Sequence, residues 1–225
     1  MKKYFSLVLC LVVSMFVFNA NVNAASKVST LPEAVEEEIG YFGDSANFED
    51  KSTFAAYAEY VDKLKKFNAK DYSESDNKVN VYIFRGKTCW HCLDEVSWLA
   101  ENYNKYAEYI NVHTYEVWND TTNSKLMNLV AKQLGKKASG VPFTVIGDQI
   151  FSGFSEELGE SMMNVAKDLY ESSSKYDIKD YIDLENVQVI KEDNKKSSSN
   201  AVMILLIAAV LLGGGALIFL ISKSK

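Results

Sequence analysis

Two cysteines, Cys89 and Cys92, are the residues of this chain best suited to chemistry, because only two residues separate them. The apolar stretch before Cys89 predicts a buried strand, and a helical pattern begins directly after it. A thiol at the start of a helix lies near unpaired backbone N–H groups and the positive end of the helix dipole, which stabilise its thiolate. Cys92, in the first turn, is close enough to close a disulfide. The pattern therefore favours thiol–disulfide exchange, with Cys89 attacking a substrate disulfide and Cys92 resolving the mixed disulfide.

A purely structural role suits this cysteine pair less well. A bridge that encloses two residues constrains little chain, so it would add little stability. The body of the chain is also large enough to bury a core without such a bridge. The third cysteine, Cys10, lies in an N-terminal apolar stretch that we expect to be removed. We therefore expect a redox-active Cys89–Cys92 disulfide, with neither a metal nor a separate cofactor.

The residues around the cysteines predict alternating strands and helices. We expect strands over residues 78–85, 111–118, 142–146 and 149–152, and helices over about 89–106, 123–134 and 156–172. Ser155 can cap the last helix. Upstream, residues 52–67 are amphipathic and predict an added helix that packs on the sheet. The fold class is therefore α/β, with a mixed sheet covered by helices on both faces.

With these elements, residues 78–172 resemble the thioredoxin superfamily. Three features carry the resemblance: the Cys89-Trp-His-Cys92 motif between a strand and a helix, Val141-Pro142 at the start of a later strand, and the final hairpin and helix. The resemblance implies a thioredoxin-like fold with a mixed four-stranded sheet. It also implies a cis peptide bond before Pro142, beside the cysteines, where the backbone of Val141 and Pro142 pairs with an extended substrate.

The two residues between the cysteines are also candidate site residues. His91 occupies the position before the resolving cysteine, as in superfamily members that oxidise or isomerise disulfides. An imidazole there stabilises the Cys89 thiolate, although His91 can also be read as an exposed residue at a helix start. Trp90 offers an apolar contact to substrate, or is simply a partly exposed aromatic residue beside the site.

The chain departs from the superfamily at two places. Many thioredoxins bury an acidic residue six positions before the first cysteine, where it assists proton transfer, but here that position holds Ile83. Either another group or water then assists this proton transfer, or resolution of the mixed disulfide is slow. Arg85 and Lys87 fit the basic glutathione contact of glutaredoxins only loosely, and solvated residues at a strand end are an equally good reading.

The two ends of the chain look like targeting segments. Lys2 and Lys3 precede an apolar run and a small-residue site at Ala24, which predicts a signal peptide. The apolar stretch 201–221 is long enough to span a membrane, and the lysines after it place the tail in the cytoplasm. The expected organisation is a signal peptide (1–24), an N-terminal helical extension (25–77), the thioredoxin-like domain (78–172), a linker (173–200), a transmembrane helix (201–221) and a cytoplasmic tail (222–225).

The balance of charged residues bears on whether the chain binds nucleic acid. The chain has 24 Lys+Arg against 30 Asp+Glu, and this acidic balance disfavours nucleic-acid binding. A single C-x-x-C pair cannot relay electrons to a second internal pair, so we expect a separate membrane redox partner. The hypothesis is a single-pass plasma-membrane oxidoreductase, bacterial and with an extracytoplasmic domain, that exchanges disulfides with exported proteins.

Two other functions stay open at this point. Cys89 and Cys92 could be ligands of a soft metal such as Zn²⁺ or Cu⁺, with His91 and His113 as the remaining candidate ligands. Alternatively, the chain could hold a redox-inert thioredoxin-like interaction domain. Measuring the metal content and the free-thiol titre of the purified protein distinguishes a metal site from an oxidoreductase. Trapping of mixed disulfides distinguishes a redox-inert domain from an oxidoreductase.

Overall fold

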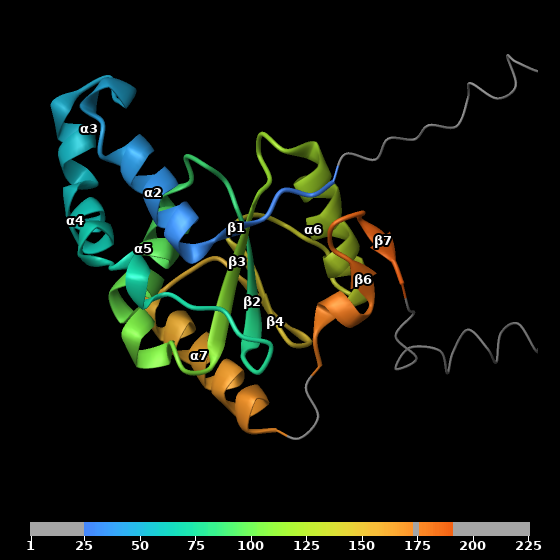
Figure 1. Ribbon diagram of the computed structural model, residues 1–225. Coiled ribbons are helices and arrows are strands. Elements are labelled where there is room, and N and C mark those ends of the chain that lie inside the picture. The colour runs from blue at the N-terminus through green and yellow to red at the C-terminus, as the bar shows by residue number, and fades with distance from the viewer. Residues whose placement is uncertain (1–24, 173–175, 191–225) are drawn as a thin grey trace, which may run out of the picture.

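The computed structural model describes residues 25–172 and 176–190 and is built around a five-stranded mixed sheet (Figure 1). The strands are β1 (Ser29–Thr30), β2 (Val79–Arg85), β3 (Ile110–Glu116), β4 (Phe143–Ile146) and β5 (Gln149–Ser152). Their order across the sheet is β1-β3-β2-β4-β5. β2 and β3 are parallel and the other neighbours are antiparallel. The sheet places the end of β2, from which the cysteines follow, near its middle.

One strand of this sheet was not foreseen from the sequence, which predicted a four-stranded sheet. The fifth strand is β1, from the N-terminal extension, and Ser29 pairs with Thr114 of β3. A strand of two residues has no alternation of apolar and polar side chains, so no pattern could indicate it. The extension therefore contributes to the sheet as well as to the helices.

Helices cover both faces of the sheet (Figure 1). They are α2 (Leu31–Phe42), α3 (Lys51–Ala56), α4 (Ala58–Lys66), α5 (Trp90–Tyr106), α6 (Thr121–Gln133) and α7 (Glu156–Glu171), with short 3-10 turns η1 (Ser45–Asn47), η2 (Ala69–Asp71) and η3 (Ile178–Asp180). Side chains of α2, α4, α5 and α7 form one core with the sheet. Those of α6 and the C-terminal segment form the other.

β2 belongs to both cores because its side chains alternate between the two faces of the sheet. Val81 and Ile83 face the core of α5, whereas Tyr82 and Phe84 face that of α6. All seven residues of the strand are buried. This explains why its sequence is a continuous run of mostly apolar residues.

The helices otherwise follow the sequence closely, with one interruption. The predicted helix over 52–67 is two helices, α3 and α4, which meet at Tyr57. The ring of Tyr57 packs 4.8 Å from that of Phe42 and 5.4 Å from that of Phe48, centroid to centroid. As expected, Ser155 caps α7, its hydroxyl accepting a hydrogen bond from the N–H of Leu158.

Part of the segment expected to be a linker is folded. Residues 176–190 form η3 and a small antiparallel pair, β6 (Ile182–Asp183) and β7 (Gln188–Val189). The side chains of Ile178 and Ile182 are fully buried against the α6 core. Two isolated apolar residues among charged ones give no period, which is why the sequence predicted a linker here.

Several expected segments lie outside the described residues. These are the signal peptide, including Cys10, the remainder of the linker from residue 191, the membrane span at 201–221 and the tail. Across residues 25–172 and 176–190, no helix is both long and apolar enough to cross a bilayer.

Candidate active site

Cys89 and Cys92 lie where β2 leads into α5. Cys89 is the N-cap residue of α5, and its carbonyl oxygen accepts hydrogen bonds from the N–H groups of Cys92 and Leu93, each at 3.0 Å. Gly86, just after β2, contacts both cysteines through its backbone. Its carbonyl oxygen accepts from the N–H of Cys89 at 3.0 Å, and its N–H lies 3.5 Å from Cys92 Sγ. The pair is in the dithiol form.

The surroundings of Cys89 favour its thiolate. The hydrogen bond from the Cys92 thiol is the largest cause, and with the N–H groups of Cys92 and His91 it lowers the pKa of Cys89 to about 6, against the opposing effect of burial. The residue as a whole is buried, with 8% of its surface accessible. Cys89 is therefore the member of the pair that can attack a disulfide near neutral pH.

Cys92 is the opposite case. It is fully buried, and burial raises its pKa well above the usual range, as does its hydrogen bond to Cys89. The N–H of Gly86 acts in the other direction but more weakly. One thiol is thus activated while its neighbour holds its proton, and this division suits an attacking and a resolving cysteine.

Val141 and Pro142 lie beside the cysteines, although Val141 is 52 positions from Cys89 in sequence. The peptide bond between them is cis. Cys89 Sγ lies 3.9 Å from the carbonyl oxygen of Val141. Pro142 itself is buried, and its carbonyl oxygen accepts from the N–H of Gly153 at 2.9 Å. The sequence-predicted neighbours of the thiol are therefore brought together by β2, α5 and β4.

His91 and Trp90 lie at the start of α5 with their rings together, the centroids 3.5 Å apart. The backbone N–H of His91 helps to lower the pKa of Cys89. The stabilising effect expected of the imidazole stays a prediction. Trp90 is 49% exposed, which leaves it available for contact with a substrate.

A buried carboxylate, Glu95, was missed in the sequence. It lies one turn after Cys92 on the buried face of α5 and is fully buried. The pKa of Glu95 is raised to about 8, chiefly by burial and to a smaller extent by the negative charge of Cys89, against the lowering effect of a hydrogen bond from Thr144. Its second oxygen, Oε2, has no hydrogen-bond partner among the described residues. Glu95 thus supplies a buried acid near Cys92, while Ile83 is an ordinary core residue.

Arg85 is not a solvated residue at a strand end. It is 1% exposed, and its guanidinium binds Glu37 and Glu38 of α2, the latter at 2.9 Å. Its Nε also lies 3.3 Å from Thr114 Oγ1. Arg85 is therefore committed to an internal ion pair and cannot form the glutathione contact considered from the sequence. Lys87 remains exposed.

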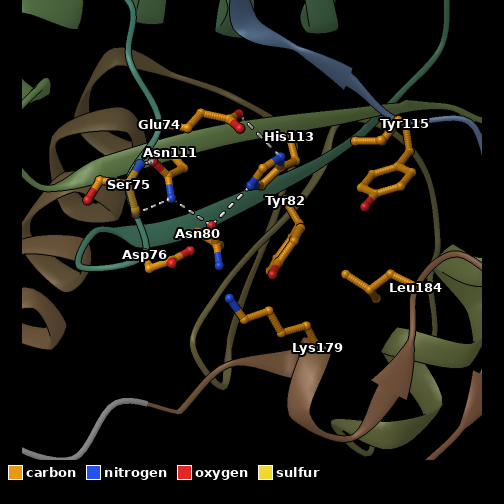
Figure 2. Close-up of a pocket in the computed structure, with 11 residues that line it drawn as sticks. Glu74, Ser75, Asp76, Asn80, Tyr82, Asn111, His113, Tyr115, Lys179 and Leu184 are labelled. Atoms are coloured by element: carbon orange, nitrogen blue, oxygen red, sulfur yellow. Dashed lines mark hydrogen bonds and ion pairs between the residues drawn. The ribbon is translucent and has the colours of Figure 1, made fainter.

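His113 lies elsewhere, in a hollow of about 650 Å³ on the α6 face of the sheet (Figure 2). Its Nε2 is 3.0 Å from Asn80 Oδ1, and its Nδ1 is 3.7 Å from a carboxylate oxygen of Glu74. Burial lowers the pKa of His113. Neither cysteine is among the residues that line the hollow. His113 is thus a hydrogen-bonded residue of the sheet, away from the cysteine pair.

The described part of the chain shows no group of three or more His, Cys, Asp or Glu side chains arranged to hold a metal ion. No protein-family model, curated protein or solved structure matches the chain. The mixed sheet flanked by helices is compatible with a thioredoxin-like fold. A function for the chain therefore has to be inferred from the cysteine pair and its surroundings.

Proposed function

We propose that this protein is a thioredoxin-like thiol–disulfide oxidoreductase whose active site is the Cys89-Trp-His-Cys92 motif. The observation that carries the proposal is the contrast within the pair: the pKa of Cys89 is lowered to about 6 and that of Cys92 is raised. Two cysteines with a purely structural role need no difference in pKa. Two cysteines that exchange disulfides need one that is a thiolate and one that stays protonated until it resolves the mixed disulfide. The adjoining Val141-Pro142 backbone supports the same conclusion.

In the reducing direction, the Cys89 thiolate attacks one sulfur of a client disulfide. The client S–S bond breaks, a mixed disulfide forms, and one client sulfur leaves as a thiolate. Cys92 then loses its proton and attacks Cys89 Sγ, which forms the Cys89–Cys92 disulfide and releases the second client sulfur. Two electrons pass from the protein dithiol to the client. Oxidation of a client dithiol is the same sequence in reverse.

We propose that Glu95 accepts the proton that the Cys92 thiol loses when it attacks Cys89. The two side chains lie one turn apart on the buried face of α5, and the charge of Glu95 raises the pKa of Cys92. Oε2 of Glu95 is unpartnered within the described part of the chain, which leaves an acceptor for a proton. A carboxylate with a pKa near 8 can take and return a proton close to neutral pH.

The cellular setting follows from the ends of the sequence. A signal peptide at 1–24 and an apolar span at 201–221 would tether the folded body outside the plasma membrane, where exported proteins form disulfides. The single C-x-x-C pair needs a separate membrane partner to reset it. We therefore propose exported protein thiols and disulfides as clients and a membrane redox protein as that partner.

A trapping experiment tests the proposal. Cys92→Ser in the full-length protein removes the resolving sulfur, so mixed disulfides between Cys89 and exported proteins should accumulate on non-reducing gels and disappear on reduction. Cys89→Ser is the matched control and should trap nothing. A clean gel for Cys92→Ser, with unchanged insulin disulfides in the presence of wild-type protein, would indicate a redox-inert domain. Stoichiometric metal with blocked thiols in the purified protein would indicate the soft-metal function instead.

A further inference from the structure

Trp118 is a large apolar side chain that the fold leaves exposed. It lies just after β3, and 56% of its surface is accessible. Its indole lies flat against Gly86: a Cβ added to that glycine would come within 2.3 Å of Trp118 Cδ2. Because Gly86 contacts both cysteines through its backbone, only one residue separates the indole from the sulfur pair.

The segment that carries Trp118 is fixed in place by the carboxylate of Glu116. Its two oxygens accept hydrogen bonds from the N–H groups of Trp118 at 2.9 Å and Asn119 at 2.8 Å. The same carboxylate accepts from the N–H of Lys87 at 3.3 Å, on the segment that leads to Cys89. The exposed indole is therefore held at a fixed place relative to the cysteines. Because the indole is already held in place, a ligand that binds to it need not immobilise it, and little side-chain entropy is lost on binding.

A polar hollow lies beside the segment that carries Trp118. A hollow of about 260 Å³ is lined by, among others, Glu116, which binds the N–H of Trp118, and by Lys87 and Asn119, which donate to the same carboxylate. The indole covers the buried Gly86 and leaves 56% of the Trp118 surface accessible, so it offers an apolar surface beside the segment that leads to Cys89. Exposed tryptophans of this kind are enriched among the residues that dominate binding at protein interfaces.

We propose that Trp118 is a substrate-docking residue that binds an apolar side chain of an unfolded client, close in sequence to the client cysteine that bonds to Cys89. The inference rests on the proposed exchange function. A client sulfur joined to Cys89 forces the neighbouring client residues to cross the surface around Cys89. Apolar side chains are exposed on a client that has not yet folded, and contact with the indole removes them from water.

Two disulfide-linked peptides of equal length test this docking. Each carries its cysteine as a mixed disulfide with a small thiol, flanked by leucines in one peptide and by serines in the other. We expect the full-length wild-type protein to react about three- to tenfold faster with the leucine peptide. Trp118→Ala should remove that preference, and Trp118→Phe should keep most of it. Val189→Ala, a change of an exposed apolar residue on β7, is the control and should leave the preference intact.

Reaction with a small symmetric disulfide separates docking from chemistry. Trp118→Ala should lose a larger factor in rate with the leucine peptide than with that compound, because the compound is too small to contact the indole. A preference for the leucine peptide that survives in Trp118→Ala would overturn the docking proposal. The proposal would also fail if the wild-type protein were a dimer in solution and Trp118→Ala a monomer, since the indole would then belong to a contact between two copies of the chain. If wild-type protein reduces neither the peptides nor the small disulfide, the exchange function itself fails.

Discussion

The hydroxyl of Thr144 donates a hydrogen bond of 2.6 Å to Oε1 of Glu95, and both residues are buried. Thr144 lies on β4, two residues after the cis peptide bond, and Glu95 lies on α5, one turn after Cys92. The bond joins the strand beside Cys89 to the helix that carries Cys92. It also leaves Oε2 of Glu95 as the unpartnered atom of this contact within the described residues.

The first prediction concerns the rate at which Cys92 resolves a mixed disulfide. Glu95→Gln keeps the shape of the side chain but cannot accept the proton of Cys92, so we expect resolution to slow about tenfold or more. Stopped-flow measurement of small-thiol release from a preformed Cys89 mixed disulfide gives the rate. Asp94→Asn, a change of the neighbouring and less buried carboxylate, should leave it unchanged. Equal rates for wild type and Glu95→Gln would remove Glu95 from the mechanism.

The second prediction concerns stability against pH. The pKa of Glu95 is raised by burial from 4.5 to about 8 in the folded protein, so the folded state binds more protons between these values than the unfolded state. The free energy of unfolding should therefore fall as pH rises from about 4.5 to 8, by up to about 4–5 kcal/mol from this group, since one pKa unit corresponds to about 1.4 kcal/mol. Denaturant titrations at pH 5 and pH 8 measure the fall, which should be smaller in Glu95→Gln. A slope unaffected by the substitution would contradict the buried, protonated state.

The third prediction concerns the thiolate of Cys89. With its pKa lowered to about 6, alkylation of Cys89 should reach half its maximal rate near pH 6 and stay high above it. The hydrogen bond from Cys92 is the largest cause, so Cys92→Ala should move the midpoint up by about one unit or more. Cys92→Ser keeps a donor and should move it less. Rates of iodoacetamide labelling, followed by mass spectrometry, would refute this account if the two variants had the same midpoint.

The fourth prediction concerns the buried ion pair between β2 and α2. Arg85→Met leaves Glu38 buried without its cation, and we expect a loss of about 3–5 kcal/mol in the free energy of unfolding. Arg85→Met combined with Glu38→Leu should recover much of that loss, because the uncompensated carboxylate is gone. Glu36→Gln on the exposed face of α2 is the control and should change little. Additive losses in the double variant would mean that the pair is not coupled.

The sequence alone predicts those elements whose apolar residues recur at a regular spacing and those marked by a few neighbouring residues. β2 and α5 follow from a continuous apolar run and a 3–4 residue spacing, and the position of Cys89 between them follows from their boundary. Ser155 was recognisable as a cap because a hydroxyl before an acidic first turn is a local signal. These are the elements that hold the cysteine pair.

What the sequence could not give depends on contacts between distant residues. Arg85 looked solvated because its partners, Glu37 and Glu38, lie more than forty positions away on another element. Glu95 left a trace, since it falls on the apolar face of α5 between Cys92 and Leu99, but a single charged residue there is also compatible with a helix edge. The exposure and fixed position of Trp118 arise from Glu116 and Gly86 together, and no spacing predicts that.

The reduction potential of the Cys89–Cys92 couple, measured on the full-length protein by equilibration in defined thiol–disulfide buffers, addresses the exchange function most directly. An exchanging pair should interconvert reversibly, with a potential between about −120 and −270 mV, where disulfide oxidants and reductants lie. A disulfide that never forms, or one so stable that its potential lies below about −300 mV, would show instead that the two sulfurs do not exchange with clients.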